Sequence, residues 1–196
     1  GIDDFSNAIE IQPDESVYYL YRGIYRIRYG DEEGAVSDYN KVIAIDPESE
    51  DGYLRLGMYK QSIEDYEGAI NDYKKAISIN PKVDYAYFGL GDIYFFSKNY
   101  RLTIEYINKG LAISPQLTNA YLKRGIAKSN FDHLNEEAID DLNNFLDANP
   151  EDSEGYYYRG KCKSALSNFE GACEDWKKAA ELGDEDAAKL LEEHCE

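Results

Sequence analysis

The chain has 196 residues, of which 21 are Lys or Arg and 39 are Asp or Glu, so its net charge is −18. Phosphate backbones and anionic lipid heads repel a chain this acidic, which makes nucleic acids and membrane surfaces poor partners. The 43% hydrophobic residues are enough for a buried core, and no apolar stretch approaches the ~20 residues of a membrane span.

Four kinds of residue recur along the chain in one register. The prolines are spaced by 34, 34, 34 and 35 residues. The four sets are Pro13, Pro47, Pro81, Pro115 and Pro150; Gly23, Gly57, Gly91, Gly125 and Gly160; Tyr19, Tyr53, Tyr87, Tyr121 and Tyr156; and Ala35, Ala69, Thr103, Ala138 and Ala172. A fixed period of this length indicates a repeat protein, in which each unit packs on its neighbours.

Each unit is predicted to be a pair of helices, the second of which ends before the proline. In chain order we expect residues 1–13 as the second helix of a truncated repeat, which suggests a piece of a longer array. The repeats 16–47, 50–81, 84–115, 118–150 and 153–183 follow, and a capping helix spans 184–196. The side chains expected to cap helix starts are Ser16, Asp84, Thr118 and Ser153 for first helices, and Asp31, Asp65, Asn99, Asn135 and Asn168 for second helices.

The Gly and Ala columns predict a close crossing of the two helices of each unit, because only a missing or one-carbon side chain leaves room there. One residue is inserted near His133, between the two helices of the fourth repeat. A loop at the tip of a helix pair accepts such an insertion at little cost.

The pattern resembles the tetratricopeptide repeat over nearly the whole chain. The segment Tyr18 to Pro47, YYLYRGIYRIRYGDEEGAVSDYNKVIAIDP, carries the Tyr…Gly…Gly-Asp…Ala…Tyr…Pro skeleton. The stretch Trp176 to Leu191 also resembles the related Sel-one-like repeats. The resemblance implies an all-α solenoid of antiparallel helix pairs that forms a right-handed superhelix, with a concave ligand-binding face lined by the first helices.

Transferring the family's ligand-facing positions onto this chain gives a mostly apolar groove. The residues expected to bind a partner are Leu20, Ile24, Leu54, Met58, Tyr85, Phe88, Asp92, Phe95, Leu122, Ile126, Tyr157 and Lys161. The family's carboxylate clamp uses Lys and Asn where this chain has Leu20, Leu54, Leu122, Ile24 and Ile126, so a clamp for acidic chaperone tails is not expected.

The aromatic residues of the third repeat form the centre of this predicted groove. Tyr85, Phe88 and Phe95 are expected to be its hot spot, because aromatic anchors dominate binding energy. The residues expected to flank it are Met58, Leu122 and Ile126. The alternative is that several of these side chains pack inward between the helices, with Phe96 the first candidate for the core.

Two charged columns run through the repeats. Basic residues at Arg26, Lys60, Lys128 and Lys163 match aspartates at Asp38, Asp72, Asp141 and Asp175. The third repeat loses both charges together and has Tyr94 and Tyr106 instead. This joint loss predicts ion pairs within each repeat, partly exposed and worth ~0.2–1 kcal/mol each.

Catalytic and metal-binding patterns are missing from the sequence. It has no HExxH, GxSxG or phosphate-loop motif, and His133 and His194 are too far apart in sequence to suggest a metal site. The three cysteines, Cys162, Cys173 and Cys195, have no zinc or redox spacing and favour buried or incidental thiols over a disulfide framework. We therefore expect no enzyme activity, cofactor or metal, while the compartment stays open with a lean towards the cytoplasm.

The leading function is a scaffold that binds a peptide or protein segment with apolar anchors. One alternative is self-association through exposed apolar surface, since Ile2, Phe5 and Ile9 lie on a helix whose partner is missing. A second alternative is an accessory array of a larger protein whose catalytic part lies outside these residues.

Overall fold

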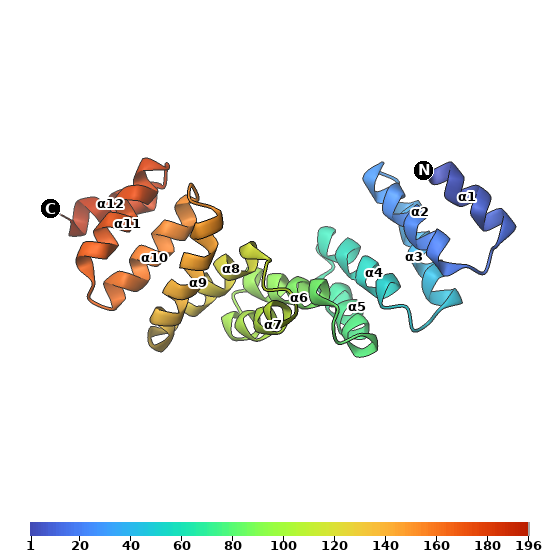
Figure 1. The fold of residues 1–196 in the computed structure, drawn as a ribbon, viewed down its shortest axis with the longest axis horizontal. Helices are drawn as coiled ribbons and strands as arrows, with labels where there is room; N and C mark the ends of the chain where they lie inside the picture. The colour runs from blue at the N-terminus through green and yellow to red at the C-terminus, as the bar shows by residue number, and fades with distance from the viewer. Residues whose placement is uncertain (196) are drawn as a thin grey trace. The chain divides into compact units, whose positions relative to one another are not determined.

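The computed structural model describes residues 1–195, which form twelve α-helices and no strand (Figure 1). The chain folds as two compact units, one from Gly1 to Ile93 and the other from Tyr94 onward. The expected all-α architecture is confirmed by these helices.

Unit 1 holds the first five helices and most of the sixth. These are α1 (Ile2–Ile11), α2 (Ser16–Arg28), α3 (Glu32–Ile45), α4 (Glu50–Ser62), α5 (Tyr66–Ile79) and α6 (Asp84–Phe96). Within this unit α2 packs on α3 and α4 packs on α5, while α1 packs on α2 and α3 on α4. The helices α2, α3 and α4 therefore each contact both the preceding and the following helix of the chain.

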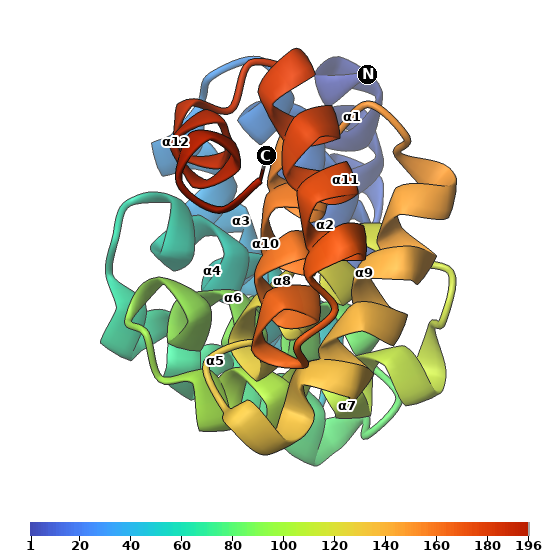
Figure 2. The same cartoon turned by 90° about the vertical axis from the view of Figure 1, so that its left-hand side faces the viewer.

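Unit 2 holds the remaining helices and one short 3₁₀ helix. These are α7 (Tyr100–Ile113), α8 (Thr118–Lys128), η1 (Asp132–Leu134), α9 (Asn135–Ala148), α10 (Ser153–Ala165), α11 (Phe169–Glu181) and α12 (Glu185–His194). Here α8 packs on α9 and α10 on α11, with α7 against α8 and α9 against α10. The last helix, α12, lies beside α11 (Figure 2).

The starts of the second helices follow the predicted caps with one exception. The side chains of Asp31, Asp65, Asn99 and Asn168 each accept a hydrogen bond from the backbone N–H three residues on, at 2.9, 3.0, 3.4 and 3.1 Å. Asn135 is wrong as a cap, because it is the first residue inside α9 and its amide donates to the Asp132 carbonyl.

The predicted caps of all four first helices are wrong, because each lies inside its helix. The residues Ser16, Asp84, Thr118 and Ser153 are the first residues of α2, α6, α8 and α10. A capping side chain must sit on the non-helical residue just outside the helix to reach the free N–H groups. Asp152 meets this condition for α10, where its carboxylate accepts from Gly155 N at 2.9 Å.

The predicted close crossing of the paired helices is confirmed. A Cβ atom added to Gly23 would lie 2.5 Å from the ring of Tyr39, and one added to Gly160 would lie 2.6 Å from Trp176. Ala35, Ala69, Thr103, Ala138 and Ala172 are all 0% exposed. The glycine of each first helix thus makes room for a large side chain of the second helix, and the small column closes the same crossing.

The predicted ion pairs within repeats are also confirmed. The distances from the basic nitrogen to the carboxylate oxygen are 2.9 Å for Arg26–Asp38, 2.7 Å for Lys60–Asp72, 3.0 Å for Lys128–Asp141 and 2.8 Å for Lys163–Asp175. In the third repeat the rings of Tyr94 and Tyr106 stack, with centroids 5.5 Å apart. An aromatic contact therefore replaces the charge pair.

The expected partial exposure of these pairs is wrong for three of the four aspartates. Asp38, Asp141 and Asp175 are only 2–3% exposed, because each also receives a bidentate guanidinium that the charge pattern did not reveal. Arg124 donates to Asp141 through Nε and Nη2, at 2.8 and 2.6 Å. Arg22 and Arg159 bind Asp38 and Asp175 in the same way.

The same arginines connect neighbouring repeats. Nη1 of Arg124 donates to Asn108 on α7 at 2.7 Å, and Nη1 of Arg159 donates to Asn143 on α9 at 2.8 Å. The second and third repeats have Leu56 and Leu90 at the arginine position, 6% and 0% exposed. The interface between repeats is therefore polar in some places and apolar in others.

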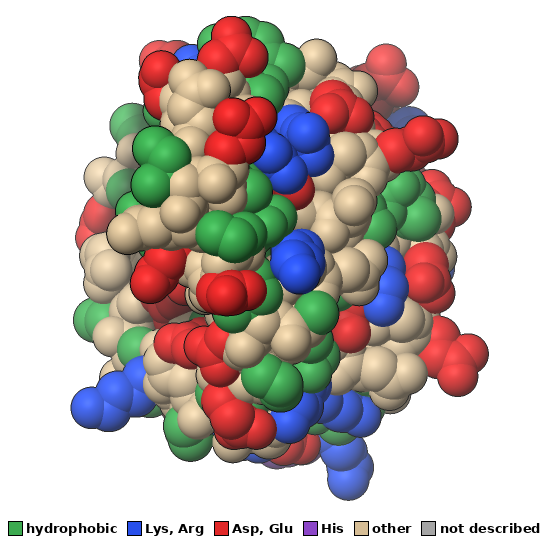
Figure 3. Space-filling view, turned by 90° about the vertical axis from the view of Figure 1, so that its right-hand side faces the viewer, with side chains coloured by type: hydrophobic (Ala, Val, Ile, Leu, Met, Phe, Trp, Pro, Cys, Tyr) green, Lys and Arg blue, Asp and Glu red, His purple; other side chains and the backbone are tan. Residues whose placement is uncertain are grey.

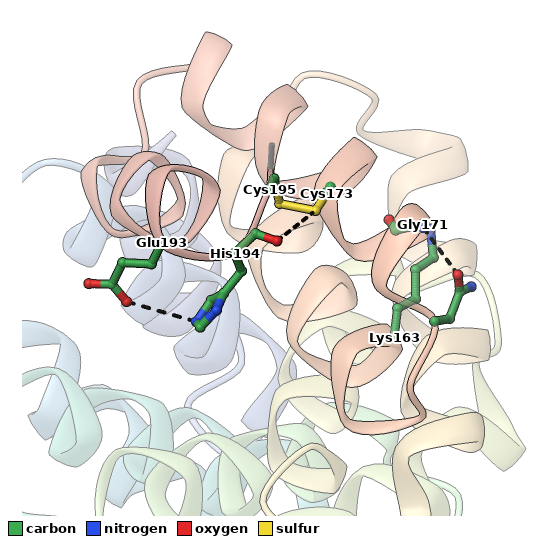
Figure 4. The surroundings of a disulfide bond; sticks show 7 residues. Lys163, Gly171, Cys173, Glu193, His194 and Cys195 are labelled. Atoms are coloured by element: carbon green, nitrogen blue, oxygen red, sulfur yellow. Dashed lines mark hydrogen bonds and ion pairs between the residues drawn. A yellow bond between two sulfur atoms is a disulfide. The ribbon is translucent and has the colours of Figure 1, made fainter.

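The prediction of unpaired thiols is wrong for two of the three cysteines. Cys173 on α11 and Cys195, which follows α12, form a disulfide with Cα atoms 5.7 Å apart (Figure 4). Sequence spacing missed the pair because α12 folds back along α11 and carries Cys195 to Cys173. Cys162 is free and 1% exposed, as expected, and its burial raises the pKa of its thiol to about 11.

Acidic side chains are spread over the face drawn in Figure 3 rather than gathered in one block. On that face carboxylates lie between hydrophobic patches and small groups of Lys and Arg.

The small-residue column predicts the effect of overpacking. Ala69→Leu should lower the free energy of unfolding by about 1–3 kcal/mol, because Ala69 is 0% exposed and has no space for three more carbons. Urea unfolding measures this. Ala44→Leu, on an exposed position of α3, is the control and should stay close to wild type; equal stability of the two variants would contradict the assigned crossing.

The buried charge cluster predicts a larger effect. Asp141→Asn should lower the free energy of unfolding by about 3–5 kcal/mol, because it leaves the partly buried Arg124 without a carboxylate partner and the buried Lys128 with only the exposed Glu137. The adjacent exposed Asp140 offers a matched control, since Asp140→Asn removes the same charge from the same helix. Thermal unfolding of both variants tests the idea, which fails if they melt together.

Candidate partner-binding surface

The residues expected to bind a partner lie on α2, α4, α6, α8 and α10 (Figure 1). Their burial divides them into three groups. Met58, Tyr85 and Lys161 are exposed; Leu54 and Ile126 are buried, at 6% and 3% exposure; and Leu20, Ile24, Phe88, Asp92, Phe95, Leu122 and Tyr157 are intermediate. Leu20 and Ile24 pack on the core cluster of Ala35, Tyr39 and Leu56.

Four of these residues come together in unit 1 around a hollow of about 200 Å³, here named the Tyr85 hollow. It lies between α4 and α6 and is lined by Met58, Gln61, Tyr73, Tyr85, Phe88, Gly89 and Asp92. Tyr85 is 57% exposed and Met58 is 42% exposed. Large apolar surface is thus accessible on both sides of the hollow.

The floor of the Tyr85 hollow is the side chain of Tyr73, which reaches it from α5. Its hydroxyl donates to Oε1 of Gln61 at 2.7 Å. The glycine at Gly89 is required for this placement, because an added Cβ would lie 2.5 Å from the Tyr73 ring. The floor is therefore fixed by packing and by a hydrogen bond before any partner arrives.

The electrostatics of the floor keep Tyr73 neutral. Burial of its hydroxyl raises the pKa of Tyr73 well above the usual tyrosine value, and the nearby carboxylates of Asp92 and Asp72 raise it further. The hydroxyl is therefore protonated at neutral pH and can donate its hydrogen bond to Gln61.

A second hollow of about 210 Å³ lies on the other side of Met58, and we name it the Arg55 hollow. Its lining comes from α2, α3 and α4 and consists of Ile27, Glu32, Tyr39, Arg55, Met58, Tyr59 and Ser62. Met58 lines both hollows. Nε of Arg55 is buried and has no hydrogen-bond partner within residues 1–195.

The candidate residues of unit 2 contact aromatic and apolar side chains of the same unit. Phe95 contacts Tyr100, with ring centroids 6.3 Å apart, and Leu122 packs on the core cluster of Ala138, Leu142 and Cys162. Lys161 lies over the rings of Tyr157 and Tyr158, with Nζ 5.2 and 5.3 Å from their centroids. These side chains form a cation–aromatic cluster rather than an open groove.

Sequence reasoning misplaced one aromatic residue and missed several of the residues that line the two hollows. Phe96, the first candidate for the core, is 66% exposed, because it lies at the C-terminal end of α6. Tyr73 and Arg55 were missed. The sequence does contain a feature that could have indicated Tyr73. It occupies the second-helix position that packs on the glycine column, and a large ring at that position extends past its own repeat.

In residues 1–195, no three or more His, Cys, Asp or Glu side chains are grouped so that they could hold a metal ion. No helix in the same range is long and apolar enough to cross a membrane.

Solved structures share this fold. The alignment with YrrB, a TPR protein with an unusual peptide-binding site, covers 98% of this chain and 100% of that chain at 20% identity and a TM-score of 0.85. MamA aligns at 24% identity and a TM-score of 0.72, over 88% of this chain and 94% of that one. MamA from Desulfovibrio magneticus RS-1, from residue 41 to its end, aligns at 20% identity and 0.72, over 85% and 94%.

Family models match the middle of the sequence, while no curated protein matches it. The model described as TPR repeat matches residues 62–95, and the one described as tetratricopeptide repeat matches residues 84–117. Both matched segments contain the Gly and Tyr columns, and the solved structures share the solenoid of helix pairs. The matched segment, residues 62–117, therefore consists of tetratricopeptide repeats, and the chain as a whole resembles proteins of that family in its fold.

Proposed function

We propose that this chain is a protein-interaction scaffold that binds an apolar segment of a partner on the first-helix face of unit 1. The observation that carries the proposal is the Tyr85 hollow, where exposed Tyr85 and Met58 flank a floor fixed by the Tyr73–Gln61 hydrogen bond. Tetratricopeptide repeat proteins are in general non-catalytic scaffolds, which agrees with this role.

The size and chemistry of the two hollows indicate how such a segment would be held. A hollow of about 200 Å³ accepts one large side chain rather than a whole ligand. With Met58 between two such hollows, an extended or helical segment could place one apolar side chain on each side of it. Because methionine is flexible and polarisable, the ridge between the hollows can adapt to different side chains.

Self-association is a second candidate function, favoured by the apolar surface at the start of unit 1. Ile11 is 80% exposed, and Val17 and Tyr21 are 42% and 47% exposed. A second copy could cover these side chains. Light scattering of the whole chain and of the triple variant Ile11→Ser, Val17→Ser and Tyr21→Ser tests this hypothesis: we expect a dimer only in the first, and a monomer in both would exclude it.

The binding proposal predicts a specific loss of affinity. Tyr85→Ala should weaken partner binding by roughly 30-fold, the effect of losing about 2 kcal/mol at an interface hot spot. The free energy of unfolding should change by less than about 1 kcal/mol, since the side chain is 57% exposed. Affinity capture from lysate of the source cells, followed by mass spectrometry, identifies the proteins lost with the variant.

Tyr29→Ala is the matched control, because Tyr29 is 72% exposed at the end of α2 and lines neither hollow. Proteins retained by wild type and by Tyr29→Ala but lost with Tyr85→Ala are ligands of the hollow. If Tyr85→Ala retains the same proteins as wild type, the site lies elsewhere. If it unfolds, Tyr85 contributes to the core instead.

A further inference from the structure

The turn between the two helices of the fourth repeat differs from the other four turns. The others contain a residue in the left-handed region: Gly30, Glu64, Lys98 and Ser167, with φ between 58 and 82°. With its one extra residue, the fourth turn forms the 3₁₀ helix η1 instead, and none of its residues has a positive φ. The insertion therefore changes the path of the chain and not only its length.

Hydrogen bonds at both ends hold this unusual turn in place. Phe131 N donates to the Lys128 carbonyl at 2.9 Å, and Leu134 N donates to the Phe131 carbonyl at 2.8 Å. The side-chain amide of Asn135, which is 4% exposed, donates to the Asp132 carbonyl at 3.1 Å. The side chains of the turn are thus presented by a fixed backbone.

The turn and α7 enclose a hollow of about 370 Å³ within unit 2, the α7–η1 hollow. Arg101, Ile104, Phe131, His133 and Leu134 line it. Arg101 and Ile104 lie three residues apart on α7 and so share one face of the helix. The ring of His133 meets the ring of Phe131 edge to face, with centroids 6.1 Å apart. Three apolar side chains therefore form the walls of a hollow larger than either of those beside Met58.

The charge of this hollow is opposite to that of the chain. No Asp or Glu lines it, although 39 such residues stand against 21 Lys and Arg in the sequence. Arg101 is exposed and forms no hydrogen bond or ion pair within residues 1–195, whereas Arg22, Arg26, Arg124 and Arg159 all bind aspartates. A guanidinium beside an apolar hollow is complementary to a carboxylate next to an apolar side chain.

We propose that the α7–η1 hollow is a second binding site, which takes a segment of a partner protein in which an apolar side chain is followed by a carboxylate. The apolar side chain enters between Ile104, Phe131 and Leu134, and the carboxylate binds the guanidinium of Arg101. The site is built by the inserted residue of the fourth repeat. It is independent of the Tyr85 hollow and of the function proposed there.

Three short peptides test the proposal on the whole chain: acetyl-Gly-Leu-Glu-Gly-amide, the same peptide with Gln for Glu, and the same peptide with Ala for Leu. Titrations are followed by the backbone NMR signals of Ile104, Phe131 and Leu134. We expect saturable shifts with the first peptide. Binding of the other two should be roughly tenfold weaker, since each lacks either the charge-assisted hydrogen bond or the apolar anchor.

The variant Arg101→Gln should bind the Glu peptide only as tightly as wild type binds the Gln peptide. Its affinity for the Gln peptide should be that of wild type. The control Arg28→Gln, at an exposed position of α2, removes the same charge far from this turn in sequence. It should change the affinity for neither peptide. The proposal is overturned if none of the three signals shifts saturably. It is equally overturned if the Glu and Gln peptides bind alike, or if Arg28→Gln weakens binding as much as Arg101→Gln.

Discussion

The close crossing of the two helices in each repeat is the constraint on which the other features of this protein depend. A glycine in the first helix faces a large side chain of the second, as Gly23 faces Tyr39, and a fully buried small residue such as Ala35 lies at the same crossing. Since the backbones can approach only there, the crossing fixes the rotation of both helices. That rotation decides which side chains face the next repeat and which face solvent.

Interfaces between repeats are built in two chemically different ways on this common frame. In the first, fourth and fifth repeats a buried aspartate such as Asp141 binds an arginine and a second cation. In the other two repeats Leu56 and Leu90 replace the arginine, and their buried side chains form apolar contacts instead. A buried charge cluster tolerates few alternative arrangements, because every unpaired charge is costly. The clusters can therefore select the register of stacking, whereas the leucines contribute burial without directional preference.

Both candidate binding sites arise where a side chain or a turn departs from the repeat. At the Tyr85 hollow, Tyr73 reaches past its own repeat to the glycine at Gly89, and its ring becomes the floor between two first helices. The α7–η1 hollow follows from one additional residue, which converts a tight left-handed turn into a 3₁₀ turn with Phe131 and Leu134 on its inner side. Residues that recur in every repeat stabilise the fold, whereas residues that differ between repeats form the two candidate binding sites.

The sequence by itself determined the helix pairs, the crossing columns and the ion pairs within repeats, because these are contacts of short range that recur with the period. In the third repeat, where both charges are lost, the structure shows Tyr94 stacked on Tyr106 in place of the ion pair. What only the tertiary structure decided depends on neighbours that are distant in sequence. The second arginine on each buried aspartate, the exposure of Phe96 and the Cys173–Cys195 disulfide belong to this group. The division of the apolar face into core and hollow also belongs to this group. Whether a side chain such as Ile126 or Tyr85 is buried depends on how closely the next helix packs against it, and the periodic pattern of the sequence does not encode that packing distance.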